Sequence, residues 1–476
     1  MDLQNQQKFY IDGEWVDPVE PSNLEVINPA TEGSVATISV GTFDDVNIAV
    51  AAARRAFESY SVSSKSERLD LLHSILKIYK KRYDEMAEII SLELGAPISM
   101  SQKSQAACGI GHLESFIEAF EKLELRQRLD NGDTLLREPI GVCGLITPWN
   151  WPVNQIALKV LPALATGCTS ILKPSELTPL SAILYAEILH EAGVPRGVFN
   201  LVNGEGPVAG AALSCHPDVN MMSFTGSTRA GIAVTRDAAE TVKKVTLELG
   251  GKSPNILFAD ADVEKAVKRG VFGCFYNSGQ SCNAPTRMLV ERPIYQKVLE
   301  IARATGESQH VGDPAVPGRH IGPVVSELQL DRIQALIKAG IEEGATLLVG
   351  GPGKPAGFDK GFYVRPTIFC DVSNDMRIAR KEIFGPVLSI IPFDDEDEAV
   401  RIANDTPYGL AAYIETGDDE KAERVAGNLR AGQVYINGTE CAYGSPFGGY
   451  KMSGLGREGG LLGLEDFLEI KAVSRP

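Results

Sequence analysis

From about residue 139 the chain alternates between short apolar runs and longer amphipathic stretches. Short apolar runs bounded by turn residues predict buried strands, and amphipathic stretches predict helices. Strands are predicted at 140–146, 169–172, 198–202, 221–224 and 245–249. Helices are predicted between them, as at 154–164 and 180–191. The rhythm indicates β-α-β units with right-handed crossovers, which form a doubly wound parallel sheet with its ligand crevice beyond the carboxyl ends of the strands.

The residues before and after this region extend the pattern. Upstream, 44–59 and 66–95 predict helices that cover the same sheet, with Asp44 and Asp45 as candidate caps of the first. The charged segment 121–138 contains Asn131 and Gly132, a pair typical of hairpin turns. Past Gly250 a second alternation starts with a strand at 255–258 and a helix at 262–276. We therefore expect a second α/β domain and a hairpin that leaves the first.

Composition narrows the class of protein. Hydrophobic residues make up 44% of the 476 residues and charged residues 23%, which is ordinary for a globular protein, so disorder does not dominate. The net charge of −16 repels a polyphosphate backbone, which argues against a nucleic-acid partner. The start MDLQNQQKFYIDGEW has no basic stretch followed by an apolar run, and no run of about 18 apolar residues occurs. We expect a cytoplasmic protein without membrane association.

Cysteine and histidine usage predicts no metal site. The eight cysteines form no C-x-x-C pair and the six histidines no H-E-x-x-H motif. Most of the cysteines are expected to be buried thiols, because free cysteine behaves as a small apolar residue.

Three segments approach known motifs without completing them. Lys252 and Ser253 resemble the end of a phosphate-binding P-loop, but the glycine that this motif requires is replaced by Thr246. Around Ser281 the nucleophile-elbow pattern G-x-S-x-G fails at Asn283, so a serine hydrolase is not supported. Gly204-Glu205-Gly206 starts a G-x-G-x-x-A pattern after a strand, a weak cofactor signal that occurs by chance in a glycine-rich chain.

Small-residue turns with reactive side chains follow several predicted strands. Trp149 and Asn150 follow the strand that ends at Ile146. Gly226 and Ser227 follow Phe224 and start a helix, whose free N–H groups favour a phosphate. After the strand at 169–172, Lys173 and Glu176 can hydrogen-bond a ribose. A carboxylate there repels a 2′-phosphate, which favours NAD over NADP, although NADP stays possible.

Two further residues have catalytic chemistry. Glu248 lies between Leu247 and Leu249 and points to the opposite face of the strand; such a carboxylate is either ion-paired or a base with a raised pKa. Cys282 lies in a polar, glycine-containing turn after a helix, where a thiol can be exposed and oriented. No histidine flanks it, so its proton must be removed by other groups, for example Glu248. Of the eight cysteines we choose Cys282 as the nucleophile.

Seven motifs in order resemble those of the aldehyde dehydrogenase superfamily. They are Pro148-Trp149-Asn150-Trp151-Pro152, Lys173-Pro174-Ser175-Glu176, Phe224-Thr225-Gly226-Ser227, Leu247-Glu248-Leu249-Gly250-Gly251-Lys252, Phe275 to Cys282, Glu382-Ile383-Phe384-Gly385-Pro386 and Pro446 to Gly454. With the hairpin, the resemblance spans nearly the whole chain. It implies a Rossmann-like cofactor domain formed by 1–118 and 139–250, a catalytic domain at 251–446, and a small β oligomerisation element at 119–138 and 447–476.

The resemblance also assigns roles by matched position. Cys282 resembles the nucleophile, Glu248 the general base and Asn150 the side-chain donor of the oxyanion hole. Lys173 and Glu176 resemble the adenosine-ribose contacts, Gly226 and Ser227 the pyrophosphate contacts, and Glu382 and Phe384 the residues that hold the nicotinamide ribose. The candidate cofactor-binding residues are Ile146, Trp149, Lys173, Glu176, Gly206, Phe224, Gly226, Ser227, Leu249, Glu382 and Phe384.

The implied reaction is NAD-dependent oxidation of an aldehyde to the acid through a cysteine thiohemiacetal and thioester, with water as the final acceptor. The family implies a homodimer or homotetramer. A CoA-acylating relative and a non-enzymatic structural protein on the same fold are the alternatives. We expect Trp151, Ser281, Asn283 and the loop 439–445 to decide substrate selectivity. No residue is clearly placed to bind a substrate carboxylate, so a semialdehyde specialist is not favoured, and the aldehyde stays unassigned.

Overall fold

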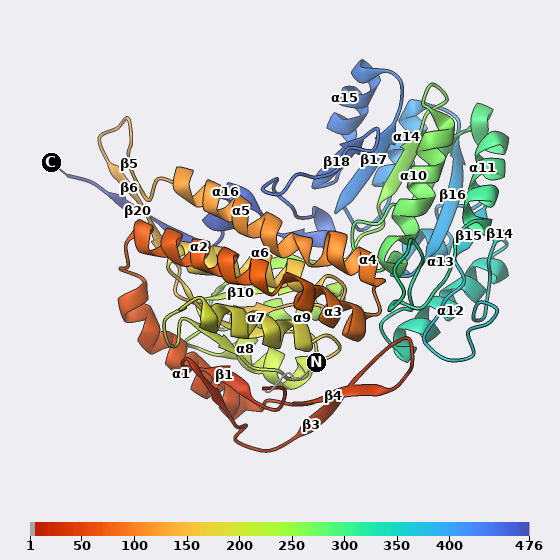
Figure 1. The fold of residues 1–476 in the computed structure, drawn as a ribbon. Coiled ribbons are helices and arrows are strands. Elements are labelled where there is room, and N and C mark those ends of the chain that lie inside the picture. Colours follow the sequence, from red (N-terminus) through yellow and green to blue (C-terminus); the bar gives the residue numbers. More distant parts are fainter. Residues whose placement is uncertain (1–4, 476) are drawn as a thin grey trace.

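Five parallel strands occupy the centre of the first sheet of the computed structural model, which describes residues 5–475 (Figure 1). Their order is β11-β10-β7-β8-β9. Their bounds are Val142–Ile146 (β7), Thr169–Lys173 (β8), Phe199–Leu201 (β9), Met221–Thr225 (β10) and Lys244–Glu248 (β11). If the five strands are numbered by their order in the chain, their spatial order is 5-4-1-2-3. This is the doubly wound arrangement, with a switch point between β7 and β10. The predicted parallel sheet is confirmed.

Three antiparallel strands widen this sheet at its edges. Phe9–Ile11 (β1) pairs with β9 and with Glu14–Val16 (β2) at one edge. At the other edge Gly454–Leu455 (β19) pairs with β11, so Glu248 lies opposite Gly454. The last strand of the parallel set is thereby covered by a segment that lies about 200 residues further along the chain.

Helices cover both faces of the first sheet. One apolar cluster joins one face of the sheet to Phe43–Tyr60 (α1), Ala211–Cys215 (α8) and Thr228–Ala239 (α9). A larger cluster joins the other face to Pro152–Thr166 (α6) and Leu180–Glu191 (α7). Outside α6 and α7 lies a further layer, formed by Lys65–Lys81 (α2), Tyr83–Leu94 (α3), Ala107–Lys122 (α5) and Gly460–Glu465 (α16). Of the two predicted upstream helical regions, only α1 contacts the sheet directly, because α2 packs on α5, α6 and α7.

In this region one local expectation was wrong, and the expected caps of α1 were right for Asp45 only. The predicted helix 66–95 is broken at Arg82, whose φ of −102° and ψ of 17° are not helical. The Arg82 guanidinium forms ion pairs with Glu85, Glu187 and Glu191 at 2.8–2.9 Å. The N-cap of α1 is Thr42, and the Asp45 carboxylate reaches back to accept from the Thr42 backbone N–H at 2.8 Å. Asp45 therefore belongs to a capping box, in which the third helical residue caps the start of the helix.

The second sheet confirms the second α/β domain. Its strands are Thr346–Val349 (β14), Thr367–Cys370 (β15), Val387–Phe393 (β16), Arg287–Glu291 (β13), Pro254–Leu257 (β12), Ala411–Glu415 (β17) and Gln433–Ile436 (β18), in spatial order. All neighbours are parallel except β14 and β15. The helices that pack on it are Val263–Phe275 (α10), Tyr295–Glu307 (α11), Glu327–Glu342 (α12), Arg377–Arg380 (α13), Glu396–Asn404 (α14) and Asp419–Asn428 (α15).

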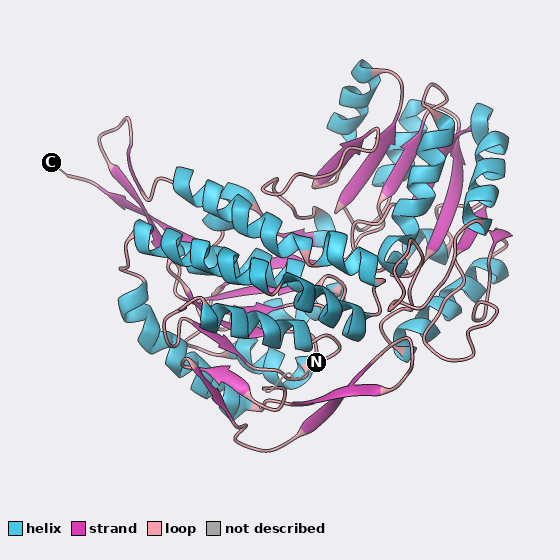
Figure 2. Ribbon diagram, viewed as in Figure 1, coloured by secondary structure: helices cyan, strands magenta, loops and turns pink. Residues whose placement is uncertain are grey.

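The predicted hairpin is confirmed and protrudes beside the C-terminal strand (Figures 1 and 2). Arg126–Arg128 (β5) pairs with Thr134–Pro139 (β6), and Leu468–Val473 (β20) adds along β6. A second hairpin, Asn23–Ile27 (β3) and Ser34–Ser39 (β4), was not predicted. Short helices complete the path, among them Ile98–Met100 (α4) and a π-helix at Ser101–Gln105 that leads into α5. Within residues 5–475 no helix has both the length and the apolar content needed to span a membrane.

Candidate active site

Two cavities meet at Cys282. One, of about 610 Å³, is lined by the turns after β7, β10 and β11 and by residues of the second domain. The other, of about 510 Å³, is lined by the first turns of α6, by α5 and by the segment from Thr439 to Ser445. Cys282 and Gln155 are the residues that line both. A group bound in one cavity can therefore meet a group bound in the other at the Cys282 sulfur. We call the first the strand-end cavity and the second the tunnel.

The turn that presents Cys282 has an unusual backbone. Asn277, Ser278 and Gly279 follow α10 with φ values of 53°, 57° and 73°, three left-handed residues in succession. Side chains other than glycine adopt this conformation only where the surroundings hold it. A β-carbon on Gly279 would stand 2.1 Å from the carbonyl of Gly385, so this turn packs directly on the loop that follows Glu382. The tight turn brings the cysteine back to the sheet edge of the first domain.

Cys282 is partly exposed, whereas five of the other cysteines are buried. Cys282 lines both cavities, which supports the prediction of an accessible thiol. Burial raises the pKa of the Cys282 thiol above its ordinary value, and the carboxylates of Glu382 and Glu248 raise it further. The thiol is therefore protonated at neutral pH, and attack on a carbonyl requires a group that takes its proton.

Asn150 is buried and lines the strand-end cavity together with Cys282. Its side-chain amide donates to the carbonyl oxygen of Gln280 at 3.0 Å. Its backbone carbonyl accepts from Asn277 Nδ2 at 2.9 Å and from Gln105 Nε2 at 3.1 Å. One amide hydrogen is thus used in this bond, and the second is available to another acceptor. Gln105 and Asn277 were not predicted, because their role arises from contacts between distant segments.

Glu248, at the end of β11, lines the same cavity with a buried carboxylate. Neither oxygen has a hydrogen-bond partner within residues 5–475. Burial raises the pKa of Glu248 well above its ordinary value; Glu458 raises it further and Lys159 lowers it. Of the two alternatives drawn from the sequence, an ion-paired carboxylate or a base with a raised pKa, the structure supports the second.

A buried ion pair, which the sequence did not predict, lies next to Glu248. Lys159 of α6 pairs with Glu458, and its ammonium also donates to Ser223 Oγ at 3.2 Å. Both charged side chains are almost wholly buried. Lys159 is the single charged residue of α6 and lies within an apolar stretch, a signal that could have pointed to a partner.

The strand-end cavity fits a dinucleotide. Gly226 and Ser227 line it at the N-terminus of α9, where Ser227 caps the helix by accepting from the Ala230 N–H at 3.3 Å. Arg332 and Lys381 also line it, so cations and a helix N-terminus face the same space, as an anionic pyrophosphate requires. Trp149, Gly226, Ser227, Leu249, Glu382 and Phe384 are the predicted cofactor residues that line this cavity.

The carboxylate of Glu382 is positioned by the glycines that follow β11. Its Oε1 accepts from the N–H of Gly251 at 3.0 Å, and a β-carbon on Gly250 would stand 2.2 Å from Oε2. Burial raises the pKa of Glu382 to about 7. Phe384, with φ of 57°, sets its ring edge-on against Trp149 at 5.3 Å. The loop that contains Glu382 and Phe384 thus contacts the turn after β11 at Gly251 and the turn after β7 at Trp149.

The other predicted cofactor residues lie further along the same sheet edge and do not line this cavity. Lys173, at the end of β8, donates to the Gly204 carbonyl at 2.8 Å and lies 3.6 Å from the Glu176 carboxylate. Ile146 and Lys173 both contact Gly210, whose β-carbon would be 3.6 and 3.7 Å from them. Phe224 is in the core beneath Gly226. Gly206 is exposed at the start of the π-helix Gly206–Gly210.

The tunnel contains Trp151, Asn283 and residues of the loop 439–445, as predicted. Ser281 does not line it; instead its hydroxyl accepts from the Trp151 indole N–H at 2.9 Å. Residues that the sequence did not single out also line it: Lys103, Cys108, His112, Asn154 and Tyr276. They come from the π-helix Ser101–Gln105, from α5 and α6 and from the residue after α10, and only the folded chain brings them together.

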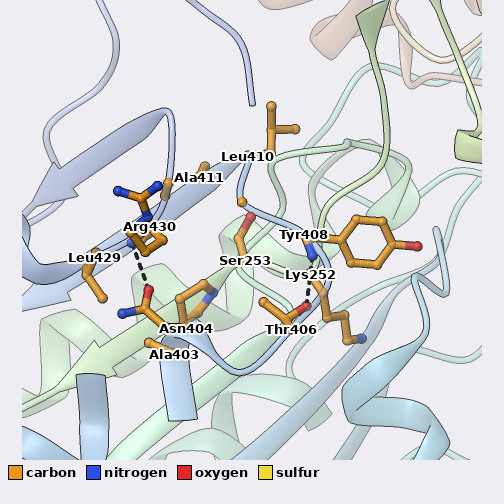
Figure 3. Close-up of a pocket in the computed structure, with 14 residues that line it drawn as sticks. Lys252, Ser253, Ala403, Asn404, Thr406, Tyr408, Leu410, Ala411, Leu429 and Arg430 are labelled. Atoms are coloured by element: carbon orange, nitrogen blue, oxygen red, sulfur yellow. Dashed lines mark hydrogen bonds between the residues drawn. The ribbon is translucent and has the colours of Figure 1, made fainter. Parts of the chain in front are cut away.

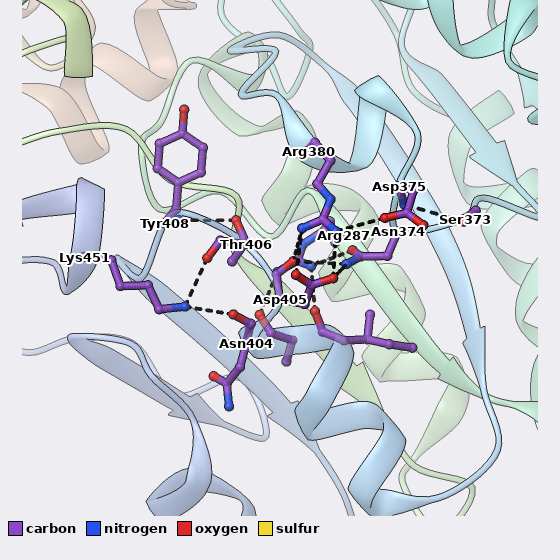
Figure 4. Close-up of polar contacts among 12 residues, drawn as sticks. Arg287, Ser373, Asn374, Asp375, Arg380, Asn404, Asp405, Thr406, Tyr408 and Lys451 are labelled. Carbon is purple, nitrogen blue, oxygen red and sulfur yellow. Dashed lines mark hydrogen bonds and ion pairs between the residues drawn. The ribbon is translucent and has the colours of Figure 1, made fainter.

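A polar cluster supports the turn after β11 from the side of the second domain. Figure 3 shows Lys252 and Ser253 beside the loop around Tyr408, where a cavity of about 10 Å³ has room for about one water molecule. The buried Arg287, labelled in Figure 4, donates to the Lys252 carbonyl at 3.0 Å and to the Ile402 and Ala403 carbonyls at 2.9 Å. Arg287 therefore joins the segment after Glu248 to the last carbonyls of α14.

Arg380 and Lys451 complete the cluster in Figure 4. Arg380 pairs with Asp405 at 2.7 Å, and Lys451 donates to the Asn404 carbonyl at 2.8 Å. These contacts fix the loop that leads from α14 to β17, and that loop packs against the turn after β11. The cluster is structural, since none of these three side chains lines either cavity at Cys282.

Comparison with known proteins places the chain in one family. The model of the aldehyde dehydrogenase family matches residues 15–473. A 3-succinoylsemialdehyde-pyridine dehydrogenase from a Pseudomonas species is 52% identical over 99% of both chains. The crystal structure of an aldehyde dehydrogenase from Bartonella henselae is 55% identical, with a TM-score of 0.97 over 99% of both chains.

Two solved relatives hold ligands. A cysteine-to-alanine variant of aldehyde dehydrogenase C from Pseudomonas syringae, in complex with NAD+ and octanal, is 51% identical with a TM-score of 0.97, covering 98% of this chain and 96% of that one. A betaine aldehyde dehydrogenase from Staphylococcus aureus in complex with NAD+ is 36% identical with a TM-score of 0.96, covering 99% and 95%. The chain therefore belongs to the aldehyde dehydrogenase family and is an aldehyde dehydrogenase.

Proposed function

We propose that Cys282 is the nucleophile, Glu248 the general base and Asn150 the oxyanion donor in the NAD-dependent oxidation that this aldehyde dehydrogenase catalyses. The observation that supports these roles is the meeting of the two cavities at Cys282, with Asn150 and Glu248 lining the strand-end cavity. An aldehyde in the tunnel and a dinucleotide at the strand ends then share one reacting atom. In a non-enzymatic protein the buried Glu248 carboxylate, which has no hydrogen-bond partner within residues 5–475, would be destabilising with no compensating role in catalysis.

The side chains supply the steps as follows. Glu248 takes the proton of Cys282, and the thiolate sulfur bonds to the aldehyde carbon. The oxygen of the resulting thiohemiacetal carries negative charge, which Asn150 Nδ2 and the backbone N–H of Cys282 stabilise. NAD supplies the hydride acceptor, which converts the thiohemiacetal into a thioester. Glu248 passes the proton taken from Cys282 to solvent and then takes a proton from water, whose oxygen attacks the thioester carbon. The carbon–sulfur bond breaks, the carboxylic acid leaves, and Glu248 returns its proton to the sulfur so that the thiol reforms.

NAD is held by the residues that line the strand-end cavity and by those that follow along the sheet edge. Gly226 and Ser227 receive the pyrophosphate, Glu382 and Phe384 the nicotinamide ribose, and Lys173 and Glu176 the adenosine ribose. The last pair supports NAD over NADP, because the Glu176 carboxylate repels a 2′-phosphate. Relatives of 51% and 36% identity hold NAD+ in their crystal structures.

Replacing the sulfur tests the nucleophile. Cys282→Ala should abolish NADH formation while NAD binding, measured by calorimetry, is retained. Cys215→Ala is the matched control, because Cys215 is an exposed cysteine at the end of α8 and lines neither cavity. Full turnover in Cys282→Ala would overturn the assignment.

The acceptor of the acyl group distinguishes our proposal from its main alternative, a CoA-acylating enzyme. A CoA-acylating enzyme transfers the thioester to CoA and does not need a base to activate water. In our proposal Glu248→Gln forms NADH slowly from the first turnover onward, because no base takes the proton of Cys282 or of the attacking water. Acceleration of the native enzyme by CoA, with a Glu248→Gln variant of undiminished turnover, would favour the CoA-acylating reading.

Two relatives suggest the size of the substrate, one by the aldehyde in its crystal structure and one by its name. Octanal is bound to the Pseudomonas syringae relative, and another relative is named for a pyridine-bearing semialdehyde. We propose an uncharged aldehyde of comparable length, since Lys103 and Glu440 contribute opposite charges to the tunnel lining. A screen of NADH formation over aliphatic, aromatic and semialdehyde substrates would test this proposal.

For assembly and location we keep the expectations drawn from the sequence: a cytoplasmic homodimer or homotetramer, with 119–138 and 447–476 as the oligomerisation element. The exposed edge of β20, where Ile470 is 59% exposed, supports pairing with a second copy. The division into a cofactor domain (1–118 and 139–250) and a catalytic domain (251–446) is likewise a proposal.

A further inference from the structure

The wall of the tunnel contains a histidine and an asparagine that the mechanism above does not use. His112 of α5 and Asn154 of α6 both line the tunnel, and His112 Nε2 lies 2.8 Å from Asn154 Oδ1. Asn154 is the residue before Gln155, which lines both cavities beside Cys282. The pair therefore lies along the path of the aldehyde chain, close to its reacting end.

The imidazole of His112 is held in one orientation. It is 8% exposed and packs edge-on against the Tyr443 ring, with centroids 5.0 Å apart at 83°. A β-carbon on Gly111 would stand 2.3 Å from that ring, so Tyr443 reaches His112 because α5 has a glycine there. Tyr443 in turn donates to Cys108 Sγ at 3.7 Å. Packing and hydrogen bonding together leave the ring little freedom.

The hydrogen-bond inventory decides which atom of Asn154 faces the substrate. Burial lowers the pKa of His112 to about 4, so the ring is neutral at pH 7 and carries one N–H. Nδ1 is buried without a partner within residues 5–475. A hydrogen on Nδ1 would be a buried donor without an acceptor, so the hydrogen is on Nε2 and is donated to Asn154 Oδ1. The amide oxygen is thus occupied, and the NH₂ group of Asn154 remains free.

We propose that the Asn154 NH₂, held by His112, recognises a second carbonyl oxygen on the aldehyde substrate, so that the enzyme prefers oxo-aldehydes to plain aldehydes of the same length. The inference rests on the function proposed above and names its substrate class. Asn154 precedes Gln155, which lines both cavities, so the test compounds have the oxo group a few carbons from the aldehyde. Asn154 is a specificity residue, and His112 is a positioning residue that acts through it.

The test compares substrates within each protein. For the native enzyme and each variant, kcat/KM is measured for 4-oxo-4-phenylbutanal and for 4-phenylbutanal, which differ only in the oxo group. We expect the native enzyme to favour the oxo compound by about three- to tenfold, the contribution of one neutral hydrogen bond. Asn154→Leu should bring the ratio to about one, mainly through a higher KM for the oxo compound. Because the ratio is taken within one preparation, it does not depend on how much of the variant is folded.

Two further variants sharpen the result. His112→Phe keeps a ring against Tyr443 but frees the amide of Asn154 to turn, so the ratio should fall part of the way. Leu158→Met, one turn further along α6 in the same tunnel wall, should keep the native ratio, because no polar atom is lost. A native ratio of one, or a ratio that Asn154→Leu leaves unchanged, would overturn the inference while the enzyme still oxidised both compounds. Inactivity of the native enzyme on both and on octanal would overturn the proposed function, and the inference with it.

Discussion

Gly251 lies so close to Cys282 that a β-carbon at position 251 would stand 2.4 Å from the Cys282 carbonyl oxygen. This contact joins the turn after β11 to the turn that presents Cys282. The position of the sulfur therefore depends on a residue that has no chemistry of its own. Local sequence does not reveal such a requirement, because it arises from close approach of two backbones.

We predict that Gly251→Ala lowers kcat about tenfold to a hundredfold, because the methyl group displaces the Cys282 turn from its place between the cavities. The check is steady-state NADH formation together with thermal unfolding, to separate misplacement from instability. Gly427→Ala is the control: it lies in α15, and a β-carbon there would meet no atom within 4 Å. Native activity in Gly251→Ala would show that the turn accommodates the displacement.

Asn150→Ala should lower kcat about 10²- to 10³-fold, the usual effect of removing one oxyanion donor. The KM for the aldehyde should change much less, because the charge develops only after the sulfur has attacked. Stopped-flow measurement of the first turnover checks that the slow step is thioester formation. An Asn150→Ala enzyme that keeps its rate but loses aldehyde affinity would instead assign Asn150 to substrate binding.

The two members of the ion pair beside Glu248, Lys159 and Glu458, should shift the pH profile of kcat in opposite directions. Burial and Glu458 raise the pKa of Glu248, and Lys159 lowers it. Glu248 acts as a base only when deprotonated, so kcat rises with pH through its pKa. Lys159→Met should therefore shift the midpoint of the kcat profile to higher pH, and Glu458→Gln should shift it to lower pH.

Both variants break a buried pair and should also lower thermal stability, typically by about 3–5 kcal/mol when one charge is left unpaired. The midpoint of a pH profile does not depend on the amount of folded enzyme, so the profiles remain interpretable. Shifts of both variants in the same direction would contradict the electrostatic account.

Glu176→Gln should raise kcat/KM for NADP relative to NAD by at least about tenfold, because a carboxylate facing a 2′-phosphate is strongly unfavourable. Lys173 stays in place in this variant, since it also donates to the Gly204 carbonyl at 2.8 Å. Glu240→Gln removes the same charge at the exposed end of α9 and should not alter the ratio. If both variants change the cofactor ratio equally, net charge and not position would be responsible.

Glu93 should make the stability of the native protein fall as pH rises. Its buried carboxylate accepts from the N–H groups of Leu180 and Ser181 at 2.7 and 3.0 Å, and burial raises its pKa from 4.5 to about 7. Between these values the unfolded chain releases a proton that the folded chain keeps. The folded state therefore loses about 1–3 kcal/mol as pH rises through this range.

Thermal unfolding at pH 5 and pH 8 checks this for the native protein and Glu93→Gln. The native protein should lose stability relative to the variant at pH 8. Glu88→Gln, on the exposed side of the same helix, should follow the native protein at both pH values. A constant difference between native protein and Glu93→Gln would contradict the prediction.

The sequence was most informative where strands are buried on both faces. Such strands appear in the sequence as short apolar runs. The five parallel strands of the first sheet all begin and end within two residues of their predicted bounds. Helix ends were less well predicted. The capping box at Thr42 and the break at Arg82 depend on side chains that reach across several residues, and for Arg82 across to α7. The β3–β4 hairpin was missed, because its strands are half exposed and carry no long apolar run.

The residues of the site also divide into those that the sequence revealed and those that it did not. Motifs that contain their own chemistry were found in the sequence: a cysteine in a glycine turn, a carboxylate at the end of an apolar strand, and an asparagine after a strand. Lys159, Glu458, Gln105, Asn277 and the pair His112 and Asn154 were not found, because each works through a partner at least 40 residues away. Their significance is in the distance between side chains, which no local pattern contains.

The sequence by itself determined the order of elements, the doubly wound sheet and the residues able to carry chemistry, because strand burial and turn composition leave local patterns. The tertiary structure alone decided which of those residues meet. The two cavities meet at Cys282 because three left-handed residues follow α10 and because the glycines at 250 and 251 leave room for Glu382 and for the Cys282 carbonyl. Contacts of this kind depend on the packing of segments far apart in the chain, where a single added methyl group is enough to move a reacting atom.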